Sequence, residues 1–163
     1  MGDRYRASSP EINHREASHF RSQPTQIKTA IKHMSKPVIL CVDDEPDILN
    51  TLKMQLKNEF KDDYFYELAE SGDEALDLLE DFQEDFQVIV VVSDWLMPGI
   101  KGDELLIKIH QKYPKIITVM LTGQADAVAV ERAVKEADLY CCLYKPWSNK
   151  ELIETIKSGL AKL

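Results

Sequence analysis

The stretch VIVVVSDWLMPGIKGDEL, residues 88–105, carries the strongest indication of the fold. It opens with five consecutive β-branched apolar residues, 88–92, without the apolar–polar alternation of a surface strand. A strand covered on both faces, as at the centre of a parallel sheet, has this composition. Asp94 follows just past this strand, before a turn that contains Pro98 and Gly99. Because open α/β sheets bind their ligands at the carboxyl edge, Asp94 is a candidate functional residue.

The size and composition of the chain indicate a single domain. It has 163 residues, a formal net charge of −8 and 44% hydrophobic residues, which suits one well-packed domain. No apolar run reaches the roughly 18 residues of a membrane span, and the N-terminus lacks the apolar core of a secretory signal. The three cysteines lie in predicted strands without metal-type spacing: Cys41, Cys141 and Cys142. We therefore expect reduced core thiols in a cytoplasmic protein.

Charge and composition divide the chain near residue 35. Residues 1–35 hold six Lys or Arg and three acids, a net charge of +3. Because the whole chain has a formal net charge of −8, residues 36–163 have a net charge of −11. The first segment is rich in Ser, Gln, Pro, His and Arg without apolar periodicity, so we interpret it as a mostly disordered leader. Its His33-Met34 pair matches a cloning scar, which leaves open whether part of it is vector-derived. The acidic remainder argues against direct nucleic-acid binding.

From residue 36 onward, short apolar runs alternate with helical periodicity. Strands are expected at 38–42, 64–68, 88–92, 116–121 and 139–144. Helices are expected after Pro46 and around 75–82, 105–109, 130–137 and 152–160. Five alternating strand–helix pairs predict one parallel sheet with helices on both faces. The predicted fold is a doubly wound α/β domain with the flavodoxin-like strand order 2-1-3-4-5.

Two finer features of the predicted helices follow from side-chain chemistry. Ser71 with Glu74, and Ser148 with Glu151, are predicted capping boxes at two helix N-termini. A predicted buried stripe on the fourth helix comprises Val130, Ala133, Val134 and Ala137.

Charged and hydroxyl side chains follow four of the predicted strands. Asp43 and Asp44 follow the first strand, Asp94 the third, Thr122 the fourth and Lys145 the fifth. Parallel strands share a carboxyl edge, so these side chains should converge there. Carboxylates about 5 Å apart repel by roughly 3 kcal/mol per pair at an effective dielectric of about 20, and such a cluster invites a divalent cation. A shallow site with few protein oxygens suits Mg²⁺, and an ammonium and a hydroxyl nearby suit phosphoryl transfer to aspartate.

The segments VDDEPD, SDWLMPGIKGDELL, MLTGQAD and LYKPW, in this order and spacing, resemble the receiver (phospho-acceptor) domain of two-component response regulators. The resemblance covers residues 36–163. It implies that Asp94 is the phospho-acceptor. It also implies a Mg²⁺ (or Mn²⁺) site formed by Asp43, Asp44, Asp94 and the backbone carbonyl of Leu96.

The same resemblance implies roles for the other strand-end residues. Thr122 is the expected switch hydroxyl and Lys145 the lysine that contacts the phosphoryl group. Pro98 and Gly99 are expected to shape the loop after the acceptor. The peptide bond before Pro146 is often cis in this family.

Two positions depart from the family pattern. Leu96 places an apolar side chain where many family members have a polar one near the phosphoryl group, and the other departure is at Cys142. Receivers usually carry Tyr or Phe three residues before the lysine, as the rotating partner of the switch threonine. Here that position is Cys142, with aromatic residues displaced to Tyr140 and Tyr144. Aromatic–threonine coupling in its usual form is therefore not expected.

The function implied by the resemblance is a cytoplasmic, phosphorylation-dependent signalling switch rather than a turnover enzyme. A histidine kinase or phosphotransfer protein would phosphorylate Asp94. A downstream effector would bind the face formed by the fourth helix, fifth strand and fifth helix, and a homodimer through this face stays open. Neither nucleic acid nor a membrane is an expected partner. The chain ends near the predicted end of the last helix, so it is either a single-domain regulator or a receiver from a longer protein.

Other functions fit the sequence less well. A pseudo-receiver, which keeps the fold as a protein-interaction module without phosphorylation, would have lost the acceptor, the acid pair or the lysine, and all are present. A magnesium-dependent aspartyl-phosphate phosphatase would carry a second aspartate where Leu96 stands, together with a cap domain. A flavodoxin would have a Ser/Thr-rich phosphate loop where this chain has DDEPD. Each site residue alone could also be a turn, cap or exposed residue.

Overall fold

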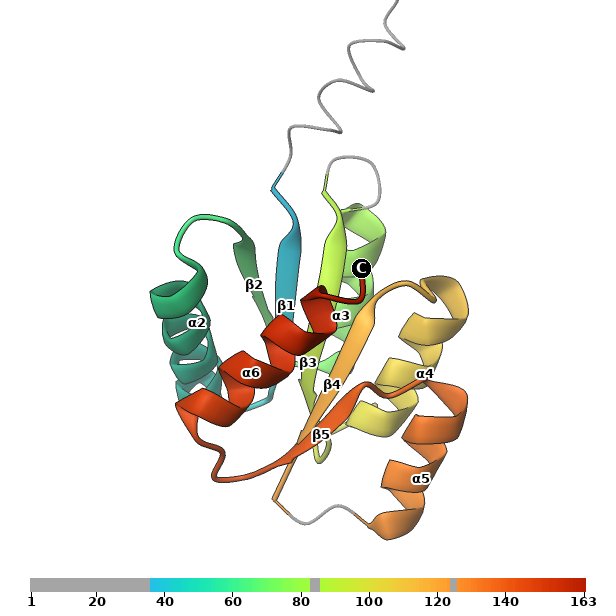
Figure 1. Cartoon of the computed structure of the whole chain (residues 1–163). Coiled ribbons are helices and arrows are strands. Elements are labelled where there is room, and N and C mark those ends of the chain that lie inside the picture. Colours follow the sequence, from blue (N-terminus) through green and yellow to red (C-terminus); the bar gives the residue numbers. More distant parts are fainter. Residues whose placement is uncertain (1–35, 83–85, 124–125) are drawn as a thin grey trace, which may run out of the picture. The chain divides into compact units, whose positions relative to one another are not determined.

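The computed structural model describes residues 36–82, 86–123 and 126–163, so the predicted leader, residues 1–35, lies outside the described residues. Strands and helices alternate along the described chain (Figure 1). The elements are β1 (Val38–Val42), α2 (Pro46–Phe60), β2 (Phe65–Ala69), α3 (Gly72–Asp81), β3 (Val88–Asp94), α4 (Gly102–Lys112), β4 (Ile117–Thr122), α5 (Ala127–Glu136), β5 (Cys141–Tyr144) and α6 (Asn149–Leu160).

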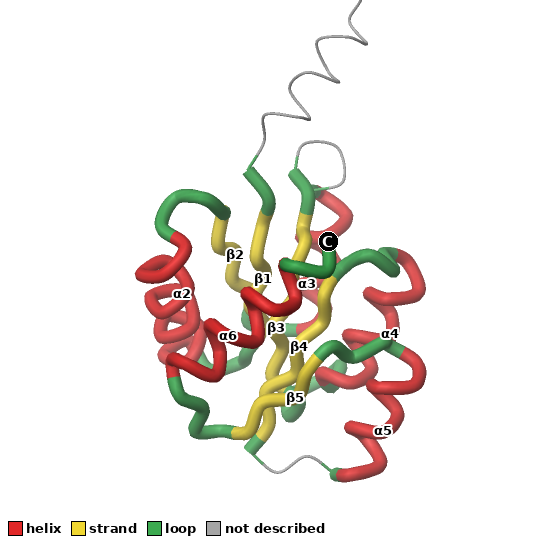
Figure 2. The backbone as a smooth tube through the Cα atoms, viewed as in Figure 1, coloured by secondary structure: helices red, strands yellow, loops and turns green. Residues whose placement is uncertain are grey.

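The five strands form one parallel sheet in the order β2-β1-β3-β4-β5, which confirms the predicted fold class and strand order (Figure 2). The predicted central strand is β3, between β1 and β4, and all its residues are buried except the half-buried Ile89. This strand is longer than predicted. Ser93 pairs with Met120 and Asp94 with Leu121, so the ladder with β4 continues to Asp94 and makes it the last residue of the strand.

The helices cover the sheet on both faces and create two apolar cores (Figure 1). On one face α2 and α6 contribute fully buried residues such as Leu52 and Ile156. On the other face α3, α4 and α5 contribute residues such as Leu106 and Ala133. Burying one leucine side chain contributes about 1.5–3 kcal/mol to folding, so both cores hold the sheet in place. The rigid sheet in turn fixes the side chains at its carboxyl edge.

Helix α5 buries a narrower stripe than predicted. Ala133 and Ala137 are fully buried and Val130 is partly buried, but the expectation that Val134 faces the core was wrong, because its side chain is 53% exposed. Helix α5 packs mainly against the single neighbour α4. A helix with one neighbour needs only a narrow apolar stripe, which leaves its remaining apolar side chains at the surface.

Only one of the two predicted capping boxes is complete. At the start of α6, Ser148 Oγ accepts from Glu151 N–H, and the Glu151 carboxylate accepts from Ser148 N–H. At the start of α3, Ser71 Oγ accepts from Glu74 N–H at 3.1 Å. The Glu74 carboxylate accepts instead from Glu70 N–H at 2.7 Å, one residue earlier than the box requires.

The cysteines are free thiols, as predicted, but only one is fully buried. Burial raises the pKa of the Cys41 thiol in β1 to about 12, so this cysteine behaves as an inert apolar residue. Cys141 and Cys142 in β5 are half-buried.

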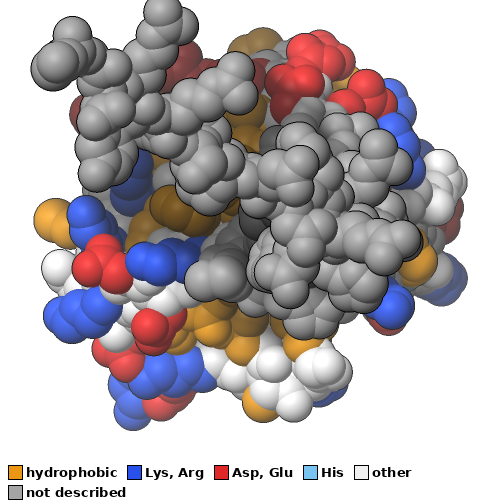
Figure 3. Space-filling view, turned by 90° about the horizontal axis from the view of Figure 1, so that it is seen from above, with side chains coloured by type: hydrophobic (Ala, Val, Ile, Leu, Met, Phe, Trp, Pro, Cys, Tyr) orange, Lys and Arg blue, Asp and Glu red, His pale blue; other side chains and the backbone are white. Residues whose placement is uncertain are grey.

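None of the described helices has both the length and the apolar character needed to cross a membrane. Seen from the amino-terminal edge of the sheet, acidic and basic side chains are interspersed over the described surface (Figure 3).

Candidate functional site

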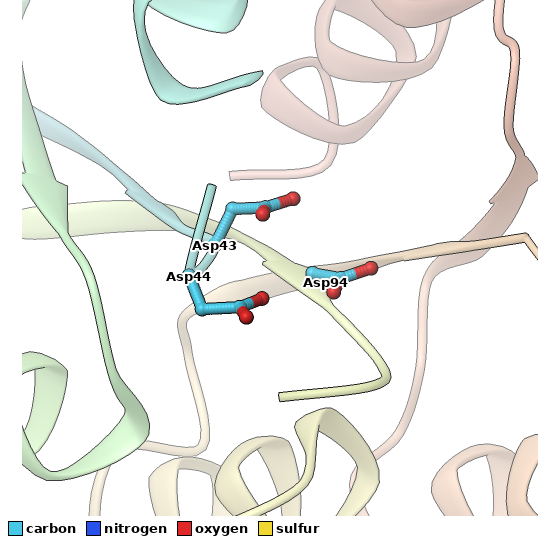
Figure 4. Close-up of side chains that lie close together, drawn as sticks. All are labelled: Asp43, Asp44 and Asp94. Atoms are coloured by element: carbon cyan, nitrogen blue, oxygen red, sulfur yellow. The ribbon is translucent and has the colours of Figure 1, made fainter. Parts of the chain in front are cut away.

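Three carboxylates meet at the carboxyl edge of the sheet and point the same way (Figure 4). Asp43 and Asp44 directly follow β1, and Asp94 ends the neighbouring β3, where Val42 of β1 is paired with Ser93. One carboxylate oxygen from each lies within 4.8 Å of the others. Asp43 is fully buried, Asp94 is 5% exposed, and Asp44 is exposed. The sheet thus brings together the acids that the sequence predicted to converge.

Lys145 places its ammonium between two of these acids. Its Nζ lies 2.9 Å from Asp94 Oδ1 and 3.0 Å from Asp43 Oδ2, and its side chain is 20% exposed. The lysine backbone N–H donates to the Thr122 carbonyl at 2.8 Å, which extends the β4–β5 ladder past the strand end. The Lys145–Pro146 peptide bond is cis. Lys145, which follows the edge strand β5, therefore forms ion pairs with both buried carboxylates, one after β1 and one at the end of β3.

Burial and charge act against one another on Asp94 and Lys145. Burial raises the pKa of the Asp94 carboxyl, and the neighbouring Asp43 charge adds to this, although Lys145 opposes it. Burial alone would lower the pKa of Lys145, but its hydrogen bonds and ion pairs with Asp94 and Asp43 outweigh burial and raise it. Lys145 thus stays charged at neutral pH, whereas burial makes the ionised form of Asp94 energetically less favourable than it is in water.

Thr122 contributes a buried hydroxyl at the end of β4. Its side chain is 0% exposed, and among the described residues its Oγ1 has no hydrogen-bond partner. An unsatisfied buried hydroxyl costs about 1–3 kcal/mol, so native proteins rarely leave one without a reason. A group with oxygen acceptors that enters the site could satisfy it.

The loop after Asp94 turns away from the sheet and exposes its tip. Gly99 has φ +77°, a left-handed conformation that favours glycine, and Pro98 beside it is exposed. The Leu96 side chain is 63% exposed and points away from the core. The tip of this loop is therefore exposed to solvent, and the part of the Leu96 carbonyl in metal binding stays a prediction.

Gly102 is a residue of the site that the sequence reasoning missed. It begins α4 and lies directly against the end of β3. A Cβ at this position would be 2.2 Å from the Asp94 carbonyl oxygen and 2.8 Å from Trp95 Cα. The Gly102 N–H also donates to the Trp95 carbonyl at 2.8 Å. Its only sequence signal is the second glycine after Asp94, at the start of the helical pattern.

The structure separates the two displaced aromatic residues near Cys142. The Tyr140 hydroxyl lies 2.5 Å from Ser158 Oγ on α6, and Lys162 Nζ lies 4.9 Å from the ring centroid. Tyr144 is 65% exposed and pairs with Thr122 in the β4–β5 register. Cys142 is half-buried against the core that contains α4 and α5. Tyr144 is thus next to Thr122 in the sheet, whereas Tyr140 is held against α6.

A groove of about 380 Å³ adjoins the site beside Lys145. It lies between α2 and the loop from β5 to α6, and its lining residues are Ile48, Thr51, Gln55, Lys145, Pro146 and Trp147. The Trp147 indole N–H donates to Gln55 Oε1 at 3.0 Å, which ties the loop to α2. The groove makes the lysine side of the site accessible from outside.

The acid cluster has the donor chemistry of a site for a hard divalent cation. Its three carboxylates supply oxygen ligands from two adjacent strand ends. Asp44 is exposed, so a cation held there could keep several water molecules, as Mg²⁺ prefers. The residues present therefore fit Mg²⁺ or Mn²⁺.

Removing the charge of Asp94 should stabilise the metal-free protein. Because the folded-state pKa of Asp94 is raised, its ionisation destabilises the fold above that pKa, and this penalty disappears as the pH falls to the usual pKa of aspartate. Asp94→Asn should therefore raise the free energy of unfolding at neutral pH by on the order of 1 kcal/mol in urea titrations followed by circular dichroism. The control Asp73→Asn removes an exposed acid from the first turn of α3 and should instead cost about 0.5 kcal/mol. Destabilisation by Asp94→Asn would contradict this account.

Comparison with known proteins agrees with this geometry. The response regulator receiver domain family matches residues 39–157. The chain is 31% identical over 122 residues to the hydrogenase transcriptional regulatory protein HoxA of Cupriavidus necator, covering 75% of this chain but only 24% of that protein.

Solved receiver domains have the same fold. The signal receiver domain of an HD domain-containing protein from Pseudomonas fluorescens Pf-5 is 32% identical, with a TM-score of 0.71 over 78% of this chain and 96% of that one. The beryllofluoride-activated NtrC4 receiver domain dimer is 26% identical, with a TM-score of 0.67 over 77% and 97% of the two chains. Together with the acid cluster at the sheet edge, these matches establish that the chain belongs to the response regulator receiver domain family of two-component signalling.

Proposed function

We propose that this receiver domain accepts a phosphoryl group on Asp94 from a histidine kinase or phosphotransfer protein and thereby gates a binding partner in the cytoplasm. The observation that carries the proposal is the Lys145 ammonium, 2.9 Å from Asp94 Oδ1 and 3.0 Å from Asp43 Oδ2, beside a third carboxylate. The proposed nucleophile, a carboxylate oxygen of Asp94, thus lies beside the fixed positive charge of Lys145 in a nearly buried site. Such pre-organised charge is the main contribution that a protein makes to phosphoryl transfer.

The transfer itself is a substitution at phosphorus. An Asp94 carboxylate oxygen attacks the phosphorus of the donor's phosphohistidine, the P–O bond forms as the P–N bond breaks, and the imidazole leaves with a proton from solvent. Lys145 balances negative charge on the transferring group, and the Thr122 hydroxyl donates to one of its oxygens. The donor would approach Asp94 beside the loop tip, where Leu96 and Pro98 are exposed.

A divalent cation belongs to this proposal. Asp43, Asp44, Asp94 and the Leu96 backbone carbonyl would hold Mg²⁺ or Mn²⁺. When bound, the cation would neutralise carboxylate and phosphoryl charge. Asp43 serves two purposes here, because it accepts from Lys145 through Oδ2 and from the Glu45 N–H through Oδ1. These bonds fix its orientation beside Asp94.

The effector is proposed to bind the face formed by α5, β5 and α6, which are the fourth helix, fifth strand and fifth helix of the predicted fold. Exposed apolar side chains support this location: Val128 and Val134 of α5 and Tyr144 of β5 are 68%, 53% and 65% exposed. Phosphorylation would shift an existing equilibrium between two arrangements of this face. The NtrC4 relative forms a dimer, and a homodimer through the same face is the second partner that we propose.

Phosphorylation of the purified protein tests the proposal. Acetyl phosphate or a phosphoramidate with Mg²⁺ should add one acid-stable, base-labile phosphoryl group, measured by intact mass spectrometry. Asp94→Asn should remove the modification, whereas the exposed control Asp73→Asn should keep it. Modification that survives Asp94→Asn would contradict the acceptor assignment. A folded wild-type protein that takes up no phosphoryl group from either donor would favour the pseudo-receiver alternative.

A further inference from the structure

The two oxygens of Asp103 contact two different elements. Asp103 is the second residue of α4, and its side chain is only 9% exposed. Its Oδ1 accepts from the indole Nε1–H of Trp95 at 3.2 Å. Its Oδ2 lies 3.5 Å from Nη1 of Arg132 on α5. Because Trp95 directly follows Asp94, Asp103 connects the residue beside the acceptor to a helix of the proposed effector face.

Helix capping alone does not account for this arrangement. An acidic residue in the first turn of a helix interacts favourably with the helix N-terminus while it remains in water. A buried carboxylate loses its hydration, which is costly unless hydrogen bonds and opposite charge replace it. For Asp103 these come from an indole of the acceptor loop and a guanidinium of α5. The buried position of the Asp103 carboxylate therefore depends on its contacts with both Trp95 and Arg132.

The Trp95 end of this connection is firmly attached to the acceptor. Gly102 lies so close to Asp94 and Trp95 that a Cβ would overlap their backbone atoms, and its N–H donates to the Trp95 carbonyl. Lys101 Nζ lies 5.3 Å from the centroid of the Trp95 ring. A movement of the backbone at Asp94 would therefore move Trp95 and the start of α4 together.

The Arg132 end can exchange its partner. The Arg132 side chain is 46% exposed, and its Nε also lies 3.7 Å from Glu136 Oε2, one turn further along α5. Arg132 thus has an alternative carboxylate on its own helix. A small displacement of Asp103 can shift the guanidinium toward Glu136 without leaving it unpaired.

We propose that Asp103 is a positioning residue that couples the acceptor site to α5 through Trp95 and Arg132. The inference rests on the proposed function, because it concerns how the state of Asp94 reaches the effector face. Coupling between sites is reciprocal, so a change at Arg132 must alter binding at the acceptor site. The connection holds the loop in its binding arrangement, and losing it should weaken binding there.

A double-mutant cycle tests the coupling with beryllofluoride, a phosphoryl mimic, as the probe. In a Trp147→Phe background, Trp95 is the remaining tryptophan, and its fluorescence reports binding in the presence of Mg²⁺. Asp103→Asn keeps an oxygen for the indole but loses the charge that pairs with Arg132, and Arg132→Gln removes the other partner. Each single variant should weaken beryllofluoride binding about threefold to tenfold. The double variant should be no weaker than the more affected single variant, because both changes break the same connection.

Lys135→Gln is the matched control. Lys135 is also an exposed cation of α5, but it pairs with Glu131 on the surface, so its loss should change beryllofluoride binding less than about twofold. The indole N–H resonance of Trp95 provides a second readout, which Arg132→Gln should shift and Lys135→Gln should not.

The outcomes separate the coupling from the proposed function. Equal effects of Arg132→Gln and Lys135→Gln would overturn the coupling, as would a double variant whose loss equals the product of the single losses. If Asp103→Asn does not fold, the comparison of Arg132→Gln with Lys135→Gln still tests the coupling. A wild-type protein that shows no beryllofluoride response would contradict the proposed function, whereas a wild-type response with independent single effects would contradict only the coupling.

Discussion

Replacing Gly102 with alanine should lower the free energy of unfolding by about 3 kcal/mol or more. The added Cβ would lie 2.2 Å from the Asp94 carbonyl oxygen and 2.8 Å from Trp95 Cα. Both are backbone atoms, so no side-chain rotation can relieve the overlap. Either α4 must move away from β3, or Asp94 and Trp95 must move from the acid cluster. Both changes should also weaken the response of Trp95 fluorescence to Mg²⁺.

Urea unfolding followed by circular dichroism measures this effect, with Gly123→Ala as the control. Gly123 is exposed, and a Cβ there would meet no atom within 4 Å, so its replacement should change stability by less than about 0.5 kcal/mol. A Gly102→Ala protein as stable as the wild type would show that α4 can move from β3 at little cost. The close backbone contact would then not be what positions Asp94.

Loss of the two acids that follow β1 should abolish magnesium binding. In a Trp147→Phe background, Mg²⁺ should change Trp95 fluorescence saturably with a dissociation constant on the order of millimolar, because the proposed site leaves the ion much of its hydration. Asp43→Ala combined with Asp44→Ala removes two of the three carboxylates, and Mg²⁺ affinity should fall by about 100-fold or more. Circular dichroism should show an intact fold, because Asp44 is exposed and Lys145 keeps its ion pair with Asp94.

A second pair of adjacent acids provides the control for charge. Asp62 and Asp63 are exposed in the turn between α2 and β2, and their joint replacement by alanine removes the same charge. This control should keep the magnesium response within about twofold, since exposed charges at a distance are largely screened. A response that persists without Asp43 and Asp44 would place the cation elsewhere and contradict the proposed metal site.

The convergence of the acids was predictable because it depends on few assumptions. An unbroken apolar run identified β3 as the central strand, and strands joined by helices had to be parallel. Residues that follow such strands share one edge of the sheet, so Asp43, Asp94 and Lys145 could be placed together without knowing any loop conformation. Strand ends were harder to predict, because the ladder with β4 extends β3 to Asp94 although Ser93 and Asp94 are polar.

The contacts between loops and helices could not be read from periodicity. Trp95 and Arg132 approach Asp103 from positions 8 and 29 residues away, and a single polar residue after a helix start looks like an ordinary first-turn acid. The exposure of Val134 depends on how many elements surround α5, which its own sequence does not encode. The predictions for the leader concern residues outside the described ranges and stay predictions.

The ion pair between Lys145 and Asp43 joins residues 102 positions apart in the chain. Contacts between distant residues form late in folding, because closing a long loop costs entropy before the contact can repay it. Lys145 directly follows β5, which leaves the ribosome after the other described strands, whereas the acids follow β1 or end β3. We therefore expect a newly synthesised chain to carry its acid cluster without its ammonium until β5 joins the sheet. Under the proposed function, Asp94 would then accept a phosphoryl group only after the fold is complete.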